Sequence, residues 1–227
     1  NKGPIFANII LADEINRISL KTQSALLEAM QEFEVTYAGT TYQLERPFFI
    51  LATQNPIEQS GTFPLPEAQL DRFLLYIRVG YPSADEERNI LERTTGRAGS
   101  VINKVIEGNE ILEAQKLVRD VHISPELVDL VSRIVRATRA GQGGSSYVNE
   151  WVRWGAGPRA GQAMILTAKA RALLHGNFSV TSDDIQHVAF PVLRHRILIN
   201  FKAEAEGVTS DDITKHILNT VTLQKSL

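Results

Sequence analysis

Two short apolar runs occur near the start of the chain, and each ends abruptly in polar side chains. Residues 9–12 read IILA and precede Asp13 and Glu14, whereas residues 48–52 read FFILA and precede the polar triplet TQN at 53–55. Uninterrupted apolar runs of this length are typical of strands covered on both faces, as in the parallel sheet of an α/β domain. The pattern therefore predicts two buried strands whose polar ends face one crevice.

The segment between these runs predicts a helix and a hairpin. Ser19 is a suitable N-cap for an amphipathic helix over residues 20–32. Residues 35–44 then alternate between apolar and polar positions around Ala38-Gly39, which indicates a β-hairpin.

The segment from residue 57 to residue 80 completes the first part of the chain. A loop rich in Gly and Pro leads to an expected short helix at 67–75, which contains the sequence LDRF, and to an expected third strand at 76–79. Ser83 and Glu86 then form a capping box, and from there to the end we expect helices rather than strands. We place the boundary near Gly80, which gives an α/β part over 1–80 and an all-α part over 81–227.

Start and stop signals define the later helices. They predict helices over about 83–93, 110–120, 124–139 and 159–174. The hexapeptide VTSDDI occurs twice, at 180–185 and 208–213, and we interpret each copy as a Thr cap with acids in the first turn. Pro191 predicts a kink or a break in the helix that follows the first copy.

Composition narrows the classes of function. The net charge is −2 and the pI is about 6.3, which disfavours nucleic acid and anionic membranes as partners. The absence of cysteine excludes disulfides, thiolate zinc sites and cysteine nucleophiles. No apolar run has the length of a membrane span, so a cytoplasmic protein is the simplest expectation. The five histidines lack metalloprotease spacing, and we interpret His195, between two arginines, as part of a solvated helix face.

The acidic pair after the first run has two interpretations. Asp13 at the end of a buried strand can hold a hydrated Mg²⁺, and Glu14 beside it can orient and deprotonate a water molecule. Alternatively, both acids simply precede the next helix.

Four segments together resemble the MoxR family of AAA+ ATPases. They are GPIFANIILADEINR at 3–17, KTQSALLEAMQE at 21–32, ATQNPIEQSGTFPLPEAQLDRF at 52–73 and GPRAGQ at 157–162. The resemblance implies an α/β fold class, with a partial AAA+ parallel-sheet core followed by an all-α lid. It also implies ATP and Mg²⁺ as cofactors and a homo-oligomeric ring, expected to be a hexamer.

The resemblance also implies roles for five residues. Asp13 is similar to the Walker B residue that helps to hold Mg²⁺, and Glu14 to the residue that activates the attacking water. Asn55 looks like sensor 1. Arg72 resembles the arginine finger that reaches the nucleotide of a neighbouring subunit. Arg159 resembles sensor 2, the lid arginine that senses nucleotide.

Each of these assignments has a simpler alternative. Asn55 suits a turn before proline, Arg72 can pair with an acid such as Glu67, and Arg159 can be a surface residue. The hairpin resembles the pre-sensor-1 hairpin, which projects towards the pore in related rings. We interpret Tyr37 and Tyr42 as cross-strand aromatics, with substrate contact as the alternative.

Two features depart from the family pattern. The phosphate-binding motif G-x-x-x-x-G-K-[ST] is absent, and its place in the family precedes Gly3. We therefore expect this chain to be the C-terminal two thirds of such an ATPase, inactive by itself. The second departure is a glycine-rich insertion at 140–157, which precedes Arg159.

Three functions follow as hypotheses. The first is a ring ATPase with a chaperone-like role that remodels protein partners, among them proteins with a von Willebrand factor A domain. The second is a non-catalytic helical interaction module on a remnant α/β scaffold, with Trp151, Trp154 and the hairpin as contact points. The third is a nucleic-acid motor, which the acidic composition disfavours.

Overall fold

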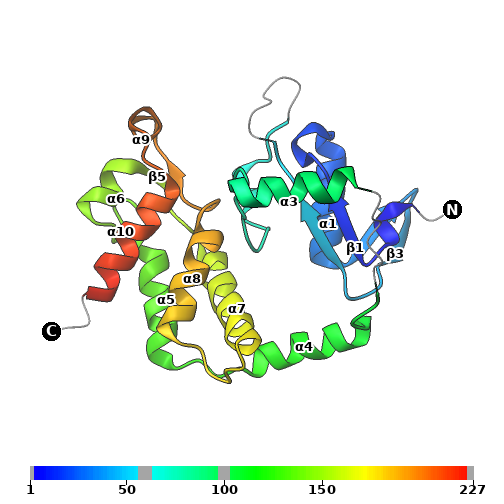
Figure 1. Cartoon of the computed structure of the whole chain (residues 1–227). Helices are drawn as coiled ribbons and strands as arrows, with labels where there is room; N and C mark the ends of the chain where they lie inside the picture. The colour runs from blue at the N-terminus through cyan, green and yellow to red at the C-terminus, as the bar shows by residue number, and fades with distance from the viewer. Residues whose placement is uncertain (1–2, 56–62, 97–102, 224–227) are drawn as a thin grey trace.

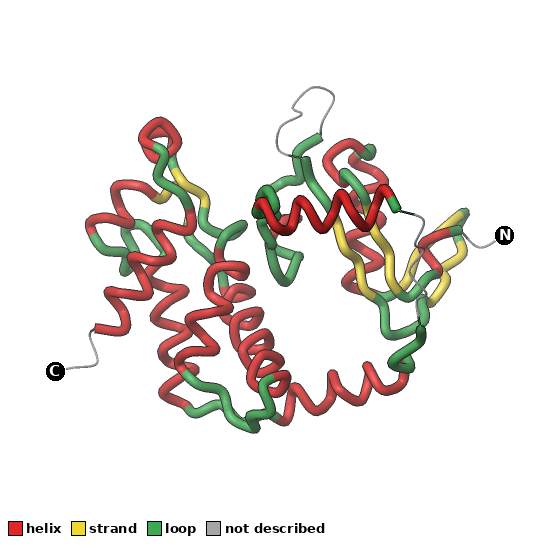
Figure 2. The backbone as a smooth tube through the Cα atoms, in the orientation of Figure 1, coloured by secondary structure: helices red, strands yellow, loops and turns green. Residues whose placement is uncertain are grey.

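The computed structural model describes residues 3–55, 63–96 and 103–223, with side chains to residue 221, and has two parts (Figure 1). A small α/β part comes first and a helical bundle follows, with helix α4 (Gly108–Asp120) running between them (Figure 2). No helix within the described ranges is long and apolar enough to cross a membrane.

The α/β part is built on two parallel strands. Strand β1 (Ile9–Ala12) pairs in register with β4 (Phe49–Ala52), so that Ala12 lies opposite Ala52. Two 3₁₀ turns flank β1, at Pro4–Phe6 and Ile15–Arg17. Helix α1 (Leu20–Glu32) follows, and its N-cap is the expected Ser19, which accepts a hydrogen bond from the Thr22 backbone N–H.

The two apolar runs form strands, but the expectation that both faces are buried was wrong. Ile9 and Leu11 are 65% and 63% exposed, and their partners Phe49 and Leu51 are also exposed, whereas Ile50 on the opposite face is buried. Side chains alternate between the two faces of a strand, so one face of this pair is covered and the other is open. No element of the described part covers the open face.

The expected hairpin is confirmed as β2 (Glu34–Tyr37) and β3 (Thr40–Gln43). Ala38 and Gly39 both have positive φ, as a two-residue hairpin turn requires. In this register Tyr42 lies opposite Val35, and Tyr37 lies opposite Thr40. The two tyrosines are therefore not a cross-strand pair.

Two expectations after residue 66 were wrong. Helix α2 covers only Glu67–Leu70, and no strand forms at 76–79. The backbone N–H of Tyr76 instead donates to the carbonyl of Pro191 at 2.8 Å. No strand in the described residues lies beside this segment, so its backbone hydrogen-bonds to the helical part instead.

The helical part has the expected helices with small shifts at their ends. Besides α4, they are α3 (Ala84–Thr95), α5 (Pro125–Ala137), α7 (Pro158–Leu174), α8 (Ser182–Leu193) and α10 (Ser210–Leu223). Two short helices, α6 (Ser146–Trp151) and α9 (Phe201–Glu206), were not predicted. Both VTSDDI copies cap helices as expected, and α8 continues past Pro191 to end two residues later.

The core of this part lies where α5, α7, α8 and α10 meet. Its fully buried side chains include Ile134, Met164, Ile185, Leu193 and Ile213. The expectation of helices alone was incomplete, because β5 (Val152–Trp154) pairs with β6 (Leu198–Ile199) in a short antiparallel sheet.

The glycine-rich insertion packs closely against the end of α5. A Cβ at Gly155 would lie 2.4 Å from the carbonyl oxygen of Thr138, closer than side chains can approach a backbone. The buried Thr138 hydroxyl accepts a hydrogen bond from the Ala156 backbone N–H at 2.8 Å and donates to the Val135 carbonyl at 2.6 Å. Gly155 is therefore needed for this contact between the insertion and the helix.

Replacing Gly155 by alanine should destabilise the protein by about 2 kcal/mol, because the methyl group displaces the Thr138 backbone. Gly161 is the matched control. It lies inside α7, where an added Cβ meets only ordinary contacts, so Gly161→Ala should leave stability unchanged or raise it by up to about 1 kcal/mol. Urea denaturation measures both, and equal stability of Gly155→Ala and wild type would contradict the packing described.

Candidate functional site

The carboxyl ends of β1 and β4 bring three polar groups together. The Thr53 hydroxyl donates to Oδ1 of Asp13 and accepts from the Glu14 backbone N–H at 2.8 Å. Backbone bonds extend the pairing, since Thr53 N–H donates to the Ala12 carbonyl and Ile15 N–H donates to the Thr53 carbonyl, each at 3.0 Å. Parallel, in-register strands therefore place both acids beside the end of β4.

Thr53 was not singled out from the sequence. A threonine at a strand end is common, and only the register of β1 and β4 shows that its hydroxyl reaches across to the acids. Asn55 follows two residues after Thr53, beyond the end of β4 at Ala52.

Glu14 has an unusual backbone and a charged neighbour. Its φ of 49° lies in the left-handed region, which is uncommon for residues other than glycine. Its carboxylate forms an ion pair with Arg17 Nε at 3.1 Å, and both side chains are partly exposed. Such a partly exposed pair contributes little to stability, and the Glu14 side chain is 34% exposed to solvent.

Asp13 could hold a magnesium ion if water and phosphate oxygens supplied the remaining ligands. Thr53 occupies one carboxylate oxygen of Asp13, and oxygen donors are those that Mg²⁺ prefers. Among the described residues, no cluster of three or more His, Cys, Asp or Glu side chains could hold a metal. Mg²⁺ would therefore need water and phosphate oxygens as its other ligands.

Arg72 and Asp71, the partner of Arg159, are adjacent in the LDRF sequence. Arg72 Nη1 donates to the Gln31 side chain of α1, while Glu67, its expected alternative partner, pairs with Arg153 at 2.6 Å. Arg159, in the first turn of α7, lies 3.5 Å from Oδ2 of Asp71. Among the described residues, Arg72 therefore contacts Gln31 and Arg159 contacts Asp71, and neither arginine contacts Asp13 or Glu14.

The residues after α8 bind the LDRF segment from the helical part. Arg196 Nε donates to Oδ1 of Asp71 at 2.8 Å, and its two terminal nitrogens donate to four backbone carbonyls. These carbonyls belong to Asp71, Phe73, Leu74 and Val192, at 2.6–3.2 Å. All five N–H donors of this side chain are used, although the side chain is only 3% exposed.

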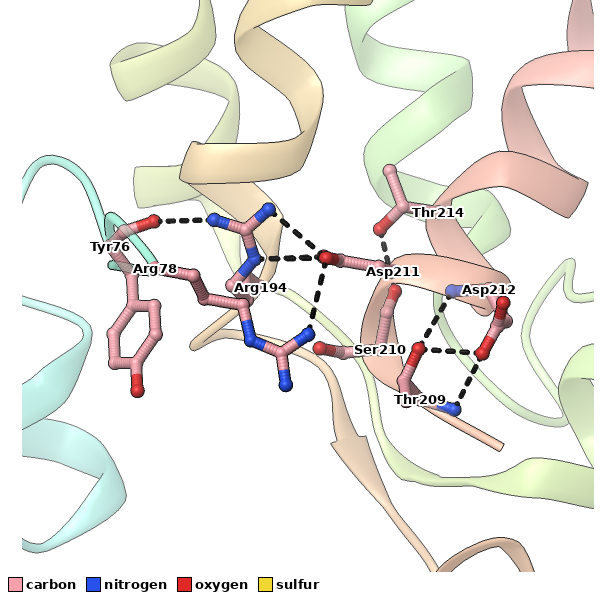
Figure 3. A network of polar contacts seen from close by, with 8 residues as sticks. All are labelled: Tyr76, Arg78, Arg194, Thr209, Ser210, Asp211, Asp212 and Thr214. Atoms are coloured by element: carbon pink, nitrogen blue, oxygen red, sulfur yellow. Dashed lines mark hydrogen bonds and ion pairs between the residues drawn. The ribbon is translucent and has the colours of Figure 1, made fainter. Parts of the chain in front are cut away.

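Arg194 and His195 extend this contact. Arg194 binds both oxygens of Asp211, at the start of α10, and donates to the Tyr76 carbonyl at 2.9 Å (Figure 3). Arg78 also lies 3.6 Å from Asp211. Two segments far apart in sequence are therefore joined through one carboxylate.

The interpretation of His195 as a solvated residue was wrong. Its ring is buried, stacks on Tyr76 with the centroids 6.0 Å apart, and contacts the Phe73 carbonyl through Nε2 at 3.1 Å. Burial, together with the charge of Arg196, lowers the pKa of His195 to about 4. The neutral ring therefore carries its proton on Nε2 and donates it to the Phe73 carbonyl.

Comparison with known proteins gives the family. Residues 1–75 match the model of the ATPase family associated with various cellular activities (AAA), and residues 145–217 match the AAA lid domain. The chain is 43% identical over 222 residues to the chaperone MoxR1 of Mycobacterium tuberculosis, covering 97% of this chain and 59% of that protein. The chain belongs to the MoxR family of AAA+ ATPases.

Two further relatives agree with this assignment. YeaC of Bacillus subtilis is 43% identical over 220 residues, which cover 96% of this chain and 66% of YeaC. The crystal structure of a candidate ATPase from Cytophaga hutchinsonii superposes with a TM-score of 0.90 at 41% identity, covering 96% of this chain and 67% of that one. The expected fold class, a partial AAA+ sheet core followed by a helical lid, is confirmed. This MoxR-family chain spans 59–67% of these three relatives.

The Thr53 hydroxyl should matter for activity in the full-length protein. Thr53→Val keeps the shape of the side chain but removes the bonds to Asp13 and to the Glu14 backbone, so we expect ATP turnover to fall about 10-fold or more. Thr53→Ser is the control and should retain most turnover. Wild-type turnover in Thr53→Val would show that the hydroxyl does not orient the acids.

Stability should fall as the pH drops towards 4. Between its ordinary value of 6.5 and its folded pKa of about 4, His195 takes up a proton only in the unfolded chain, so unfolding becomes easier as the pH falls. The loss in the free energy of unfolding that this proton uptake causes is at most about 3 kcal/mol, and it is absent above pH 6.5.

The variant His195→Gln tests this, because the amide can still donate to Phe73 but does not titrate. Urea denaturation at about pH 7 and about pH 4.5 should show a smaller loss of stability in the variant than in the wild type. Acids with lowered pKa values, Asp184 and Asp212, titrate alike in both proteins. Equal losses would contradict a buried, neutral His195.

Proposed function

We propose that the full-length protein is a Mg²⁺-dependent ATPase whose subunits assemble into a ring and remodel protein partners in a chaperone-like role. The main support is the pairing of β1 with β4, which sets Asp13 and Glu14 beside the strand that leads to Asn55. The relative described as a chaperone, MoxR1, covers almost the whole of this chain.

Within this proposal each polar group at the strand ends has one task. Asp13 would hold Mg²⁺ through water, and a bound Mg²⁺ would supply positive charge beside the phosphates. Glu14 accepts a proton from the attacking water. Asn55 donates its amide to the γ-phosphate or to that water, and Thr53 orients the two acids.

The cradle for the phosphates is proposed to come from a segment that precedes Gly3 in the full-length protein. The exposed apolar face of β1 and β4 supports this, because four large side chains there lack cover in the described residues. A strand and helix from that segment would cover the face and carry the phosphate-binding loop. This chain by itself should therefore bind ATP weakly and turn over none.

Arg72 and Arg159 are proposed to complete the site. Arg72 acts as the arginine finger for the nucleotide of a neighbouring subunit, which requires a ring, expected to be a hexamer. Arg159 acts as sensor 2, and its guanidinium lies 3.5 Å from Oδ2 of Asp71, the residue before Arg72. We further propose a core over 1–80 and a lid over 81–227, a cytoplasmic location, and a protein substrate or a von Willebrand factor A domain as partner.

The competing proposal is a non-catalytic interaction module. Trp154 is 71% exposed, which suits a contact point, but Trp151 is buried and packs near Tyr147 and Lys202. Only one of the two tryptophans is therefore available to a partner, which weakens this alternative.

Glu14→Gln in the full-length protein should lower ATP turnover at least about 100-fold while ATP still binds, because the amide cannot accept the proton. Arg72→Ala should lower it similarly. Equal mixtures of the two variants should recover about a quarter of wild-type turnover, since one interface in about four then joins an intact Glu14 to an intact Arg72.

The control for this mixture is Asp13→Asn with Glu14→Gln. Both residues lie on one strand end, so no interface has a complete site and no activity should return. Unchanged turnover in Glu14→Gln would refute its role in water activation, and an absence of rescue by Arg72→Ala at every ratio would refute a finger acting between subunits.

A further inference from the structure

We propose that Arg196 is a positioning residue for Arg72, because it ties the backbone around Arg72 to the lid. The position of the lid in one subunit therefore controls where Arg72 lies in the active site of the neighbouring subunit. This inference rests on the proposed function of Arg72. It assigns to a buried lid residue a part in catalysis at the adjacent subunit.

The first support is the set of groups to which the Arg196 side chain donates hydrogen bonds. Asp71 and Phe73, on either side of Arg72, both accept from the same terminal nitrogen, at 3.0 and 2.7 Å. The Asp71 side chain accepts from Nε as well. The backbone of Arg72 is thus held on both sides by one planar group.

The second support is the rigidity of Arg196 itself. Its remaining nitrogen donates to Val192 in the last turn of α8 and to Leu74, so the side chain is bonded to the preceding helix and to the segment at once. A guanidinium has a fixed fork geometry, and five occupied donors leave it no alternative position. A movement of α8 must therefore move residues 71–74 with it.

The third support is that neighbouring contacts repeat the same attachment. His195 donates to Phe73, and Arg194 donates to Tyr76 while it binds Asp211 of α10 (Figure 3). Asp71 also faces Arg159, the proposed nucleotide-sensing residue of α7. The segment that carries Arg72 therefore receives contacts from α7 and from the residues that follow α8, and Asp211 of α10 binds one of these residues, Arg194.

A finger must reach a phosphate with sub-ångström accuracy, and a displacement of about 1 Å can lower a rate about 100-fold. Among the described residues, the Arg72 side chain has one hydrogen-bond partner, Gln31. Its placement therefore depends on its backbone, which Arg196 holds. The contact is specific to arginine, because lysine supplies three donors from a single nitrogen and cannot bridge these carbonyls.

The test is Arg196→Lys in the full-length protein. It keeps the charge opposite Asp71 but loses the fork, so kcat for ATP should fall about 10-fold or more while KM changes less than about 3-fold. Equal mixtures of Arg196→Lys with Glu14→Gln should regain activity, because the variant keeps its own Glu14 and receives an intact finger. A variant with a generally damaged lid would also lose its own site and would not be rescued.

Asp71→Asn is the second variant, since it retains the shape of the residue and an acceptor oxygen while removing its charge. It should give the same pattern with a smaller loss of kcat, and it decides the question if Arg196→Lys does not fold. Wild-type kcat in a folded Arg196→Lys, or a loss that Glu14→Gln cannot rescue while it does rescue Arg72→Ala, would overturn the inference. If Arg72→Ala itself kept full turnover, the proposed function would fail instead.

Discussion

The structure depends on how the polar backbone of residues 71–76 is satisfied. These residues leave the α/β part without joining its sheet, and their carbonyl groups need partners once they are covered. Three consecutive lid residues provide them: Arg194, His195 and Arg196 bind carbonyls from Asp71 to Tyr76. A buried guanidinium is tolerated only when it is fully hydrogen-bonded and paired, and Arg196 meets both conditions. The two parts of the chain are therefore joined by polar contacts of defined geometry.

The other constraint is the register of β1 with β4. Parallel pairing without a shift puts Thr53 opposite the acids, and its hydroxyl contacts both of them. The same pairing leaves the Ile9 and Leu11 side chains on a face that the described residues do not cover. The chain thus contains an ordered acidic edge and an apolar face open to solvent, a combination expected of a sheet that has further neighbours in the full-length protein.

Much of the fold could be predicted from local signals. Caps at Ser19, Ser83 and Thr181, and the turn at Ala38-Gly39, are encoded within four residues of sequence, and all four are observed. The expected strand at 76–79 failed because strands need partners, which a local pattern does not reveal. Burial of the first strands failed for the same reason.

Some residues of the candidate site could likewise be predicted from the local sequence, and others could not. Asp13 and Glu14 were recognisable because acids follow an apolar run and match a family motif. Thr53, His195 and Arg196 were not, because their importance arises from contacts with residues about 40 and more than 120 positions away. A charged triplet in sequence looks like a solvated helix face, and only the fold shows that two of its members are buried.

The most direct test of the account is a structure of the full-length protein with Mg²⁺ and a non-hydrolysable ATP analogue. The account predicts that Asp13 and Asn55 of one subunit face the γ-phosphate and that Arg72 of the adjacent subunit reaches it from the opposite side. A nucleotide bound away from the ends of β1 and β4, or an Arg72 that faces solvent in the closed ring, would contradict it.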